Sequence, residues 1–301
     1  MEKDNIPKPT TEITVCGGIA RVIAYGKIKQ KGEDYDWSLQ RQTKKEYDLA
    51  RNVLLQHARH RTLWAPKPTT HNGLVLCPLE THFHEIDTGQ GAEIEGIIIR
   101  RGVHADGVIL HSKLDAFLMT PADCATVVLS YRDPHGHRKV IAMHASRGSL
   151  IDLSRFKPEC KHREHEGIIE SAFTRIPKHE IEHVQAWVGI SVSPGAHFAH
   201  RIEDKENPHN GLFVEYIREK YGPECFADDG KGGKEGWLDK RMLVKRQLTM
   251  LGVPEKNIDV DTTCTYSEKN GFGEHRWYSH IRGVEEKTGP FRNLVLVIRN
   301  H

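Results

Sequence analysis

The sequence predicts a mixed α/β (α+β) protein, with a single domain over residues 1–301 in which helices flank a central mixed sheet. Short runs rich in β-branched and apolar residues alternate with segments whose apolar residues recur at helical spacing, and no repeat or linker separates them. The composition has 38% hydrophobic and 28% charged residues, which excludes the disordered and collagen-like classes. A chain of 301 residues is long enough to bury a large core without disulfides.

The first half of the chain indicates one helix among several short strands. Residues 11–27 are rich in β-branched side chains and are interrupted by Gly17-Gly18, which predicts two strands around a turn. From Ser38 to about Arg59 the apolar positions lie at helical spacing until prolines break the pattern, so a helix is expected there. Further strands are predicted at residues 73–78, 94–99, 108–110, 116–119 and 126–131.

A hairpin is predicted over residues 126–143, because Asp133-Pro134-His135-Gly136 has turn chemistry and separates two apolar strands. In such a hairpin the residues that flank the far ends of the two strands come together. The rest of the chain is predicted to contain helices at 168–176, 211–221 and 238–251, strands at 184–192, 258–260 and 294–298, and a flexible loop at 228–236.

Charge and hydropathy argue against two classes of partner. The 43 Lys and Arg residues balance 41 Asp and Glu residues to a net charge of +2 without a long basic block, so we expect no nucleic-acid binding. The apolar stretches are far shorter than the roughly 20 residues that span a bilayer, so we expect no membrane interaction. The start of the sequence shows no apolar core of a secretory signal, which predicts a cytoplasmic protein whose six cysteines are free thiols.

Common catalytic and metal motifs are absent from the sequence. There is no C-x-x-C, which excludes zinc ribbons, ferredoxin-type clusters and thioredoxin-like sites. Phosphate-binding glycine loops and the nucleophile elbow are also missing. Cys160, His162 and His165 form a small cluster in a polar segment, where the alternatives are a metal site and a solvated surface.

The stronger candidate site consists of His104, Cys124 and His144, which lie at or beside the ends of predicted strands. Residues at the ends of adjacent strands can meet at one edge of a sheet. Two imidazoles and one thiolate suit zinc with a fourth position open to water or substrate, which is the catalytic arrangement. The alternative is a half-buried cysteine and two histidines with ordinary hydrogen bonds.

Several segments resemble, in order along the chain, the motifs of the laccase-domain family. Thr120–Leu129 and Val140–Gly148 are similar to its "ADC" and "HAGWRG" core. The other matching segments are Arg101-Gly102-Val103-His104 ("QVHG"), Asp115-Ala116 ("DA"), Trp187-Val188-Gly189 with Pro194, Cys264-Thr265 ("CT") and Tyr278–Gly283. The resemblance covers about residues 95–300.

The resemblance implies that His104, Cys124 and His144 bind zinc, with copper as the less favoured metal. It further implies a purine nucleoside phosphorylase for adenosine- or inosine-type nucleosides, with nucleoside and phosphate as small-molecule partners and deamination as a side activity. Two alternatives stay open. One is a copper-dependent phenol oxidase. The other is a non-enzymatic member that only binds, because the segment His144–Gly148 lacks the family's Trp and residues 151–166 look like an insertion.

The predicted catalytic residues are Cys124, Asp123, Arg147 and Arg282. Either Asp115 or Asp123 is expected to accept a hydrogen bond from the second nitrogen of a zinc-bound imidazole. Arg147 and Arg282 are the expected phosphate ligands, because a guanidinium group binds phosphate bidentately.

Overall fold

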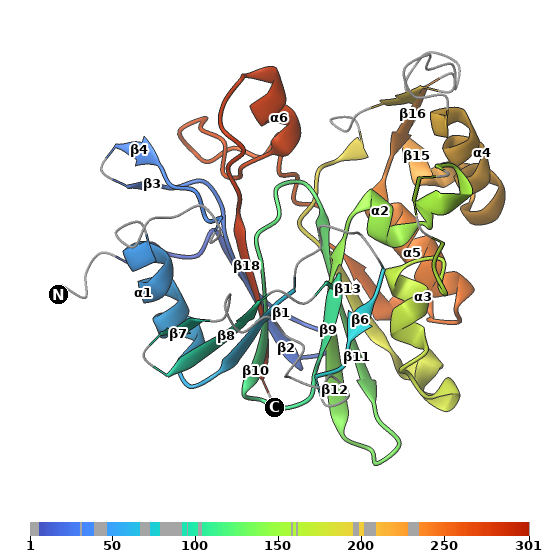
Figure 1. The fold of residues 1–301 in the computed structure, drawn as a ribbon, viewed down its shortest axis with the longest axis horizontal. Coiled ribbons are helices and arrows are strands. Elements are labelled where there is room, and N and C mark those ends of the chain that lie inside the picture. Colours follow the sequence, from blue (N-terminus) through green and yellow to red (C-terminus); the bar gives the residue numbers. More distant parts are fainter. Residues whose placement is uncertain are drawn as a thin grey trace.

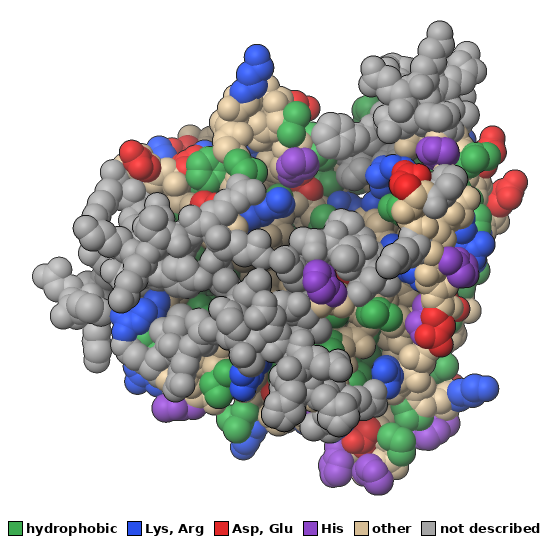
Figure 2. Space-filling view, viewed as in Figure 1, with side chains coloured by type: hydrophobic (Ala, Val, Ile, Leu, Met, Phe, Trp, Pro, Cys, Tyr) green, Lys and Arg blue, Asp and Glu red, His purple; other side chains and the backbone are tan. Residues whose placement is uncertain are grey.

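The computed structural model describes residues 6–30, 32–38, 47–66, 73–78, 92–94, 96–101, 104–157, 159–160, 162–194, 199–201, 209–227 and 235–300. Within these residues two mixed β-sheets pack face to face, and helices cover the outer face of each sheet (Figure 1). No helix in the described part of the chain is long and apolar enough to cross a membrane. On the face seen in Figure 2, the described Lys and Arg side chains are interspersed with Asp and Glu.

The first sheet has seven strands in the order β1-β2-β18-β10-β5-β8-β7. Its neighbours are antiparallel except for β10 with β5 and β5 with β8, which are parallel. Strand β18 lies between β2 and β10, so segments from near both ends of the chain meet in one sheet. The strands are β1 (Thr11–Val15), β2 (Ala20–Tyr25), β5 (Thr62–Ala65), β7 (Ala92–Ile94), β8 (Ile97–Arg101), β10 (Asp115–Met119) and β18 (Leu294–Arg299).

The second sheet has six strands in the order β17-β13-β11-β12-β9-β6. Its two outer pairs, β13 with β17 and β6 with β9, are parallel, and the inner pairs are antiparallel. The strands are β6 (Val75–Leu76), β9 (Gly107–Leu110), β11 (Ala125–Arg132), β12 (Arg138–Ala145), β13 (Gln185–Gly189) and β17 (Ile258–Val260). Because both faces of this sheet are covered, β11 is buried continuously from Ala125 to Tyr131 rather than at alternate positions.

The core is divided into layers by the two sheets. Side chains such as Val22, Phe117 and Trp187 fill the space between the sheets. Helix α1 (Tyr47–Ala58) covers the outer face of the first sheet. Helices α3 (Ile168–Phe173), α4 (His209–Tyr221) and α5 (Lys240–Met250) pack on the outer side of the second.

The remaining elements are short. They comprise α2 (Arg147–Leu150), α6 (His280–Glu285), the 3-10 helices η5 (Leu153–Arg155), η6 (Lys178–His183), η8 (Pro223–Cys225) and η9 (Glu255–Asn257), a sheet of β14 (Ala199–Arg201), β16 (Glu235–Leu238) and β15 (Phe226–Ala227), and the pair β3 (Lys29–Gln30) and β4 (Glu33–Asp34). Figure 1 shows α2 and α6 at the upper ends of the two sheets.

The predicted hairpin is confirmed. Strands β11 and β12 pair antiparallel from Ala125 opposite Ala145 to Arg132 opposite Arg138. The carboxylate of Asp133 closes the turn by accepting the backbone N–H groups of His135 and His137, both at 2.9 Å. Gly136 takes a positive φ of 79°, which a residue with a side chain rarely adopts.

The mixed class is confirmed, but three details of the prediction are wrong. The strands form two stacked sheets where one central sheet was expected, because pairing with distant strands assigns each strand to its sheet. Of the predicted helix from Ser38 to about Arg59, Ser38 is not helical, α1 covers Tyr47–Ala58, and residues 39–46 lie outside the described residues. Directly before Ser38, Trp37 is fully buried and its indole N–H donates to the carbonyl of Gly26 at 2.8 Å. Residues 235–236 belong to β16, whereas the first part of the predicted loop, residues 228–234, lies outside the described residues.

Candidate functional site

Cys124 and His144 lie at the same end of the second sheet. Cys124 directly precedes β11, and His144 on β12 is opposite Thr126 in the antiparallel register. The two side chains are hydrogen-bonded to each other. The hairpin thus brings two of the predicted site residues into contact.

The surroundings of Cys124 favour its thiolate form. Burial by itself raises the pKa of the thiol, but the positive charges of Lys240 and His144 and the hydrogen bond from His144 outweigh burial and lower the pKa to about 7. Burial instead raises the pKa of Cys16 to about 12. Because the thiolate is the form that attacks electrophiles and binds metals, Cys124 is chemically competent near neutral pH.

His144 is supported by a buried carboxylate, Asp106, which has no exposed surface. The Nδ1 atom of His144 lies 3.7 Å from Oδ1 of Asp106, and the backbone N–H of His144 donates to the carbonyl oxygen of Asp106 at 2.7 Å. The Oδ2 atom of Asp106 accepts the N–H of Gly73 at 2.8 Å. Burial opposes charge on the imidazole, but Cys124 and Asp106 outweigh burial and raise the pKa of His144 to about 9.

The carboxylate beside His144 is therefore neither of the two that were predicted. Asp115 accepts the backbone N–H groups of His111 and Ser112 at 3.1 and 2.9 Å, as a turn residue does. Asp106 carries no motif in the sequence. The pairing of β9 with β12, with Gly107 opposite Met143, is what sets Asp106 beside His144.

Asp123 joins three segments that are far apart in the sequence. Its Oδ1 atom accepts the hydroxyl of Thr265 at 2.6 Å, and its Oδ2 atom accepts the hydroxyl of Ser279 at 3.1 Å and the backbone N–H of Ile281 at 3.0 Å. The carboxylate is buried. These contacts connect the segment before Cys124 to the two late motifs. A catalytic role of Asp123 stays a prediction.

Lys240 is a further site residue, and no motif in the sequence indicates it. It is the first residue of α5 and is only 3% exposed, and its Nζ atom donates to the carbonyl oxygen of Asp123 at 2.8 Å. Its charge helps to lower the pKa of Cys124. A lysine in the first turn of a helix opposes the helix dipole, and this local conflict is the signal that could have drawn attention to it.

Arg147 is the first residue of α2, three positions after His144. The helix begins there because Ser146 and Ser149 form a capping box. The guanidinium of Arg147 lies 5.7 Å above the ring of Phe213, and burial lowers its pKa. A phosphate contact by Arg147 stays a prediction.

The guanidinium of Arg282 is engaged with the backbone of its own region. It donates to the carbonyl oxygens of Thr265 at 3.4 Å, Tyr266 and Trp277. The side chain is 7% exposed and burial lowers its pKa. These contacts anchor the loop that precedes α6; the predicted phosphate contact of Arg282 is not tested by them.

Among the described residues, no three His, Cys, Asp or Glu side chains lie close enough together to hold a metal ion. His104 is exposed, and the two residues before it lie outside the described part. Cys124 and His144 nevertheless supply two adjacent donors of the types that zinc prefers, and Asp106 stands behind the imidazole as carboxylates do in zinc sites. Zinc binding by the predicted trio stays a prediction.

The second candidate cluster lies in the segment that looks like an insertion. His162 is exposed, and its Nδ1 atom lies 3.0 Å from Oδ2 of Asp152. The segment packs on α4 through the buried Glu166, whose Oε2 atom lies 2.9 Å from the guanidinium of Arg155 and 3.3 Å from the ammonium of Lys220. Within the cluster, the imidazole of His162 thus contacts a carboxylate and, at 3.3 Å, the hydroxyl of Ser154, and the choice between a metal site and a solvated surface stays open.

Comparisons with known proteins agree with this architecture. The structure is similar to Neisseria meningitidis protein NMB0706, with 16% sequence identity and a TM-score of 0.61 over 96% of this chain and 99% of that chain. It is also similar to YlmD from Geobacillus stearothermophilus, with 18% identity and a TM-score of 0.60 over 94% of this chain and 92% of that chain. A third similar structure is YfiH from Bacillus licheniformis, with 15% identity and a TM-score of 0.56 over 93% of this chain and 92% of that chain. Among curated proteins no sequence matches.

A family model described as multi-copper polyphenol oxidoreductase laccase matches residues 58–298. This span contains every segment that carried the motif resemblance and all of the predicted site residues. The structural similarities, which at these identities concern the fold alone, extend over nearly the whole chain. The chain therefore belongs to the multi-copper polyphenol oxidoreductase laccase family, the laccase-domain family that its motifs indicated.

Proposed function

We propose that this protein is a purine nucleoside phosphorylase whose active site is built around Cys124 and His144. The observation that carries the proposal is the row formed by the buried Asp106 and His144 and the half-buried Cys124, in which a carboxylate supports an imidazole and the imidazole contacts a thiol of lowered pKa. Family membership is consistent with an enzyme, and the motif resemblance supplies the nucleoside substrate.

Zinc is the cofactor that the donor set favours. Cys124 and His144 would hold it together with His104, and zinc, when bound, supplies a Lewis acid beside the substrate. The thiolate form of Cys124 suits this role because only the deprotonated thiol binds metal. Asp106 would then fix the ring orientation of His144 from behind.

Phosphorolysis needs positive charge near the attacking anion and a fixed geometry at the sugar. A phosphate oxygen forms a bond to C1′ while the C1′–N bond breaks, and the base leaves with the bonding electrons and takes up a proton. Lys240 and Arg147 are the cations we assign to the phosphate. Arg282 is less suited, because its guanidinium donates to three backbone carbonyls, whereas the ammonium of Lys240 donates to one and has two further N–H donors.

The test is an assay of the purified protein with adenosine, inosine and guanosine, with and without phosphate. Release of free base and formation of ribose 1-phosphate only when phosphate is present is the expected result. Cys124→Ser should abolish the reaction, whereas the matched Cys160→Ser should leave it unchanged, since none of the described side-chain hydrogen bonds and ion pairs joins Cys160 to the row.

Other outcomes identify the alternatives. Ammonia release without base release would indicate a deaminase. Oxygen-dependent oxidation of a phenol by copper-loaded protein, without nucleoside cleavage, would indicate the copper-dependent phenol oxidase. If none of these substrates reacts, the enzyme proposal is refuted in favour of a binding function.

A further inference from the structure

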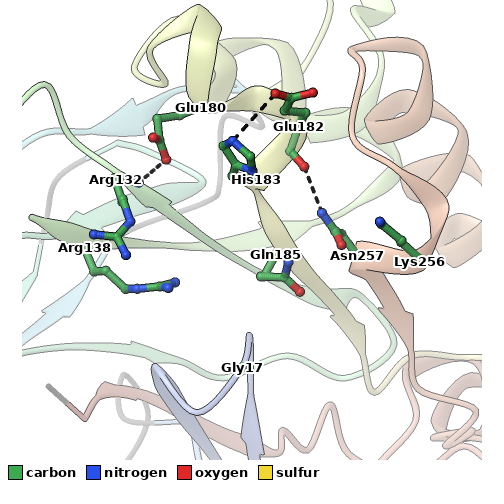
Figure 3. A pocket seen from close by; sticks show the side chains of 9 residues that line it. All are labelled: Gly17, Arg132, Arg138, Glu180, Glu182, His183, Gln185, Lys256 and Asn257. Atoms are coloured by element: carbon green, nitrogen blue, oxygen red, sulfur yellow. Dashed lines mark hydrogen bonds and ion pairs between the residues drawn. The ribbon is translucent and has the colours of Figure 1, made fainter. Parts of the chain in front are cut away.

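We propose a second ligand site, for a phosphorylated small molecule, in a cavity at the end of the β11–β12 hairpin opposite to Cys124 (Figure 3). Its volume is about 640 Å³, within the range of small-molecule pockets. Strand β11 has eight residues, which separate the cavity from Cys124 by about 25 Å. The site is therefore distinct from the candidate active site and does not depend on the proposed function.

The cavity is lined by two arginines that the hairpin forces together. Arg132 ends β11, Arg138 begins β12, and the register places them directly opposite each other. Like charges in opposite positions of an antiparallel pair are unfavourable. Among the described residues no carboxylate pairs with either guanidinium; the one hydrogen bond of these groups runs from Arg132 to the carbonyl oxygen of Gly136 at 3.3 Å.

The carboxylates at the cavity are directed to other groups. The side chain of Glu180 accepts the backbone N–H of Arg132 at 3.3 Å, and that of Glu182 lies 3.6 Å from Nε2 of His183. Lys256 also lines the cavity and has no ion pair within the described structure. The lining therefore has one more cation than anions, and a bound anion would supply the countercharge that the two arginines lack.

A buried hydroxyl lies directly behind the arginine pair. Ser130 is two residues before Arg132 and so faces the same side of β11, has no exposed surface, and carries a hydroxyl without a hydrogen-bond partner. Its partner on β13 is Gln185, which lines the cavity. Buried hydroxyls are normally paired, so Ser130 is an independent sign that an oxygen-bearing group belongs here.

The chemistry of the lining specifies the class of ligand. Two adjacent guanidinium groups offer the fork geometry that binds phosphate bidentately. The volume exceeds what one phosphate ion fills, and the amide of Gln185 can bond to hydroxyl groups. Figure 3 shows Arg132 and Arg138 on one side of the cavity, Gln185 beside them and Gly17 facing them. We infer a phosphate ester of a hydroxyl-rich compound such as a sugar phosphate.

Calorimetric titration with glucose 6-phosphate, glucose and inorganic phosphate tests the site. Glucose 6-phosphate should bind at one site per chain, more tightly than inorganic phosphate, and glucose should not bind. Arg138→Gln should weaken binding about tenfold or more, because it removes a charge-assisted contact. Arg59→Gln, which removes an exposed charge directly after α1 and outside the lining of the cavity, should leave binding unchanged.

Absence of saturable binding, equal affinity in the two variants, or tighter binding of inorganic phosphate would overturn the assignment. Thermal unfolding gives a second measurement that does not depend on calorimetry. Without ligand, Arg138→Gln should not lower the melting temperature, because it relieves like-charge repulsion. Glucose 6-phosphate should raise the melting temperature of the wild type and Arg59→Gln by more than that of Arg138→Gln. A lower melting temperature of ligand-free Arg138→Gln would assign this arginine to the fold instead.

Discussion

Asp123→Ala is expected to lower the free energy of unfolding by about 3–5 kcal/mol, whereas Asp123→Asn should cost only about 1–2 kcal/mol. The carboxylate accepts hydrogen bonds from Thr265, Ser279 and the backbone N–H of Ile281. Each hydrogen bond to a charged group contributes about 1.5–3 kcal/mol, but the two hydroxyls can rotate toward new acceptors after truncation, so the loss is smaller than the sum.

The asparagine variant tests the hydrogen-bonding explanation itself. Its carbonyl oxygen can still accept from Ile281 and Ser279, and the hydroxyl of Thr265 can reverse its role and accept from the new amide. Urea unfolding of both variants measures the difference. Asp115→Ala is the control, because Asp115 also accepts several hydrogen bonds but is less buried and bonds mainly within its own turn, so a loss of about 1–2 kcal/mol is expected.

The explanation would be refuted if Asp123→Ala lost less than about 1 kcal/mol, or if the asparagine variant were as unstable as the alanine variant. In the first case the carboxylate would not join the three segments in solution. In the second case the negative charge, and not the set of accepted hydrogen bonds, would be the important property of Asp123. A double-mutant cycle with Thr265→Val separates the contribution of that single contact.

The other predictions concern the site itself. Elemental analysis should find one zinc ion per chain in the wild type and in Cys160→Ser but none in Cys124→Ser; retained zinc in Cys124→Ser would refute the ligand assignment. In metal-depleted protein, the rate of Cys124 alkylation should rise with pH and reach half its maximum near pH 7, because only the thiolate reacts; a midpoint near that of an ordinary thiol would contradict the lowered pKa. Asp106→Asn should weaken zinc binding about 10- to 100-fold, since it loosens the orientation of His144; unchanged affinity would remove Asp106 from this role. Arg282→Ala should lower stability by about 2–4 kcal/mol in urea unfolding, because three backbone carbonyls lose a charged donor; unchanged stability with impaired phosphate use would instead favour the phosphate contact.

Much of the secondary structure could be predicted from local patterns. The hairpin is the clearest case, since the turn chemistry at Asp133–Gly136 and the apolar runs on either side depend only on neighbouring residues. That hairpin already implied that Cys124 and His144 meet. Strands buried on both faces and helices with one apolar face also left patterns that do not require knowledge of the fold.

The division of the strands between two sheets could not be obtained in this way. Strand β18 inserts between β2 and β10, and this pairing joins segments separated by most of the chain. The β-propensity of a segment predicts that it forms a strand but does not predict which other strand it pairs with. For this reason the prediction of a single central sheet is wrong, and the strands form two main sheets.

The sequence by itself determined the chemical types at the site, a thiol and imidazoles at strand ends, and the family motifs that surround them. Only the tertiary structure decided which groups support them. Asp106 reaches His144 because β9 pairs with β12, and Lys240 reaches the carbonyl of Asp123 across 117 positions of sequence. Hydrogen bonds and charge interactions act over a few ångströms in space, so residues that tune a thiol or hold an imidazole leave no pattern along the chain until the fold brings them together.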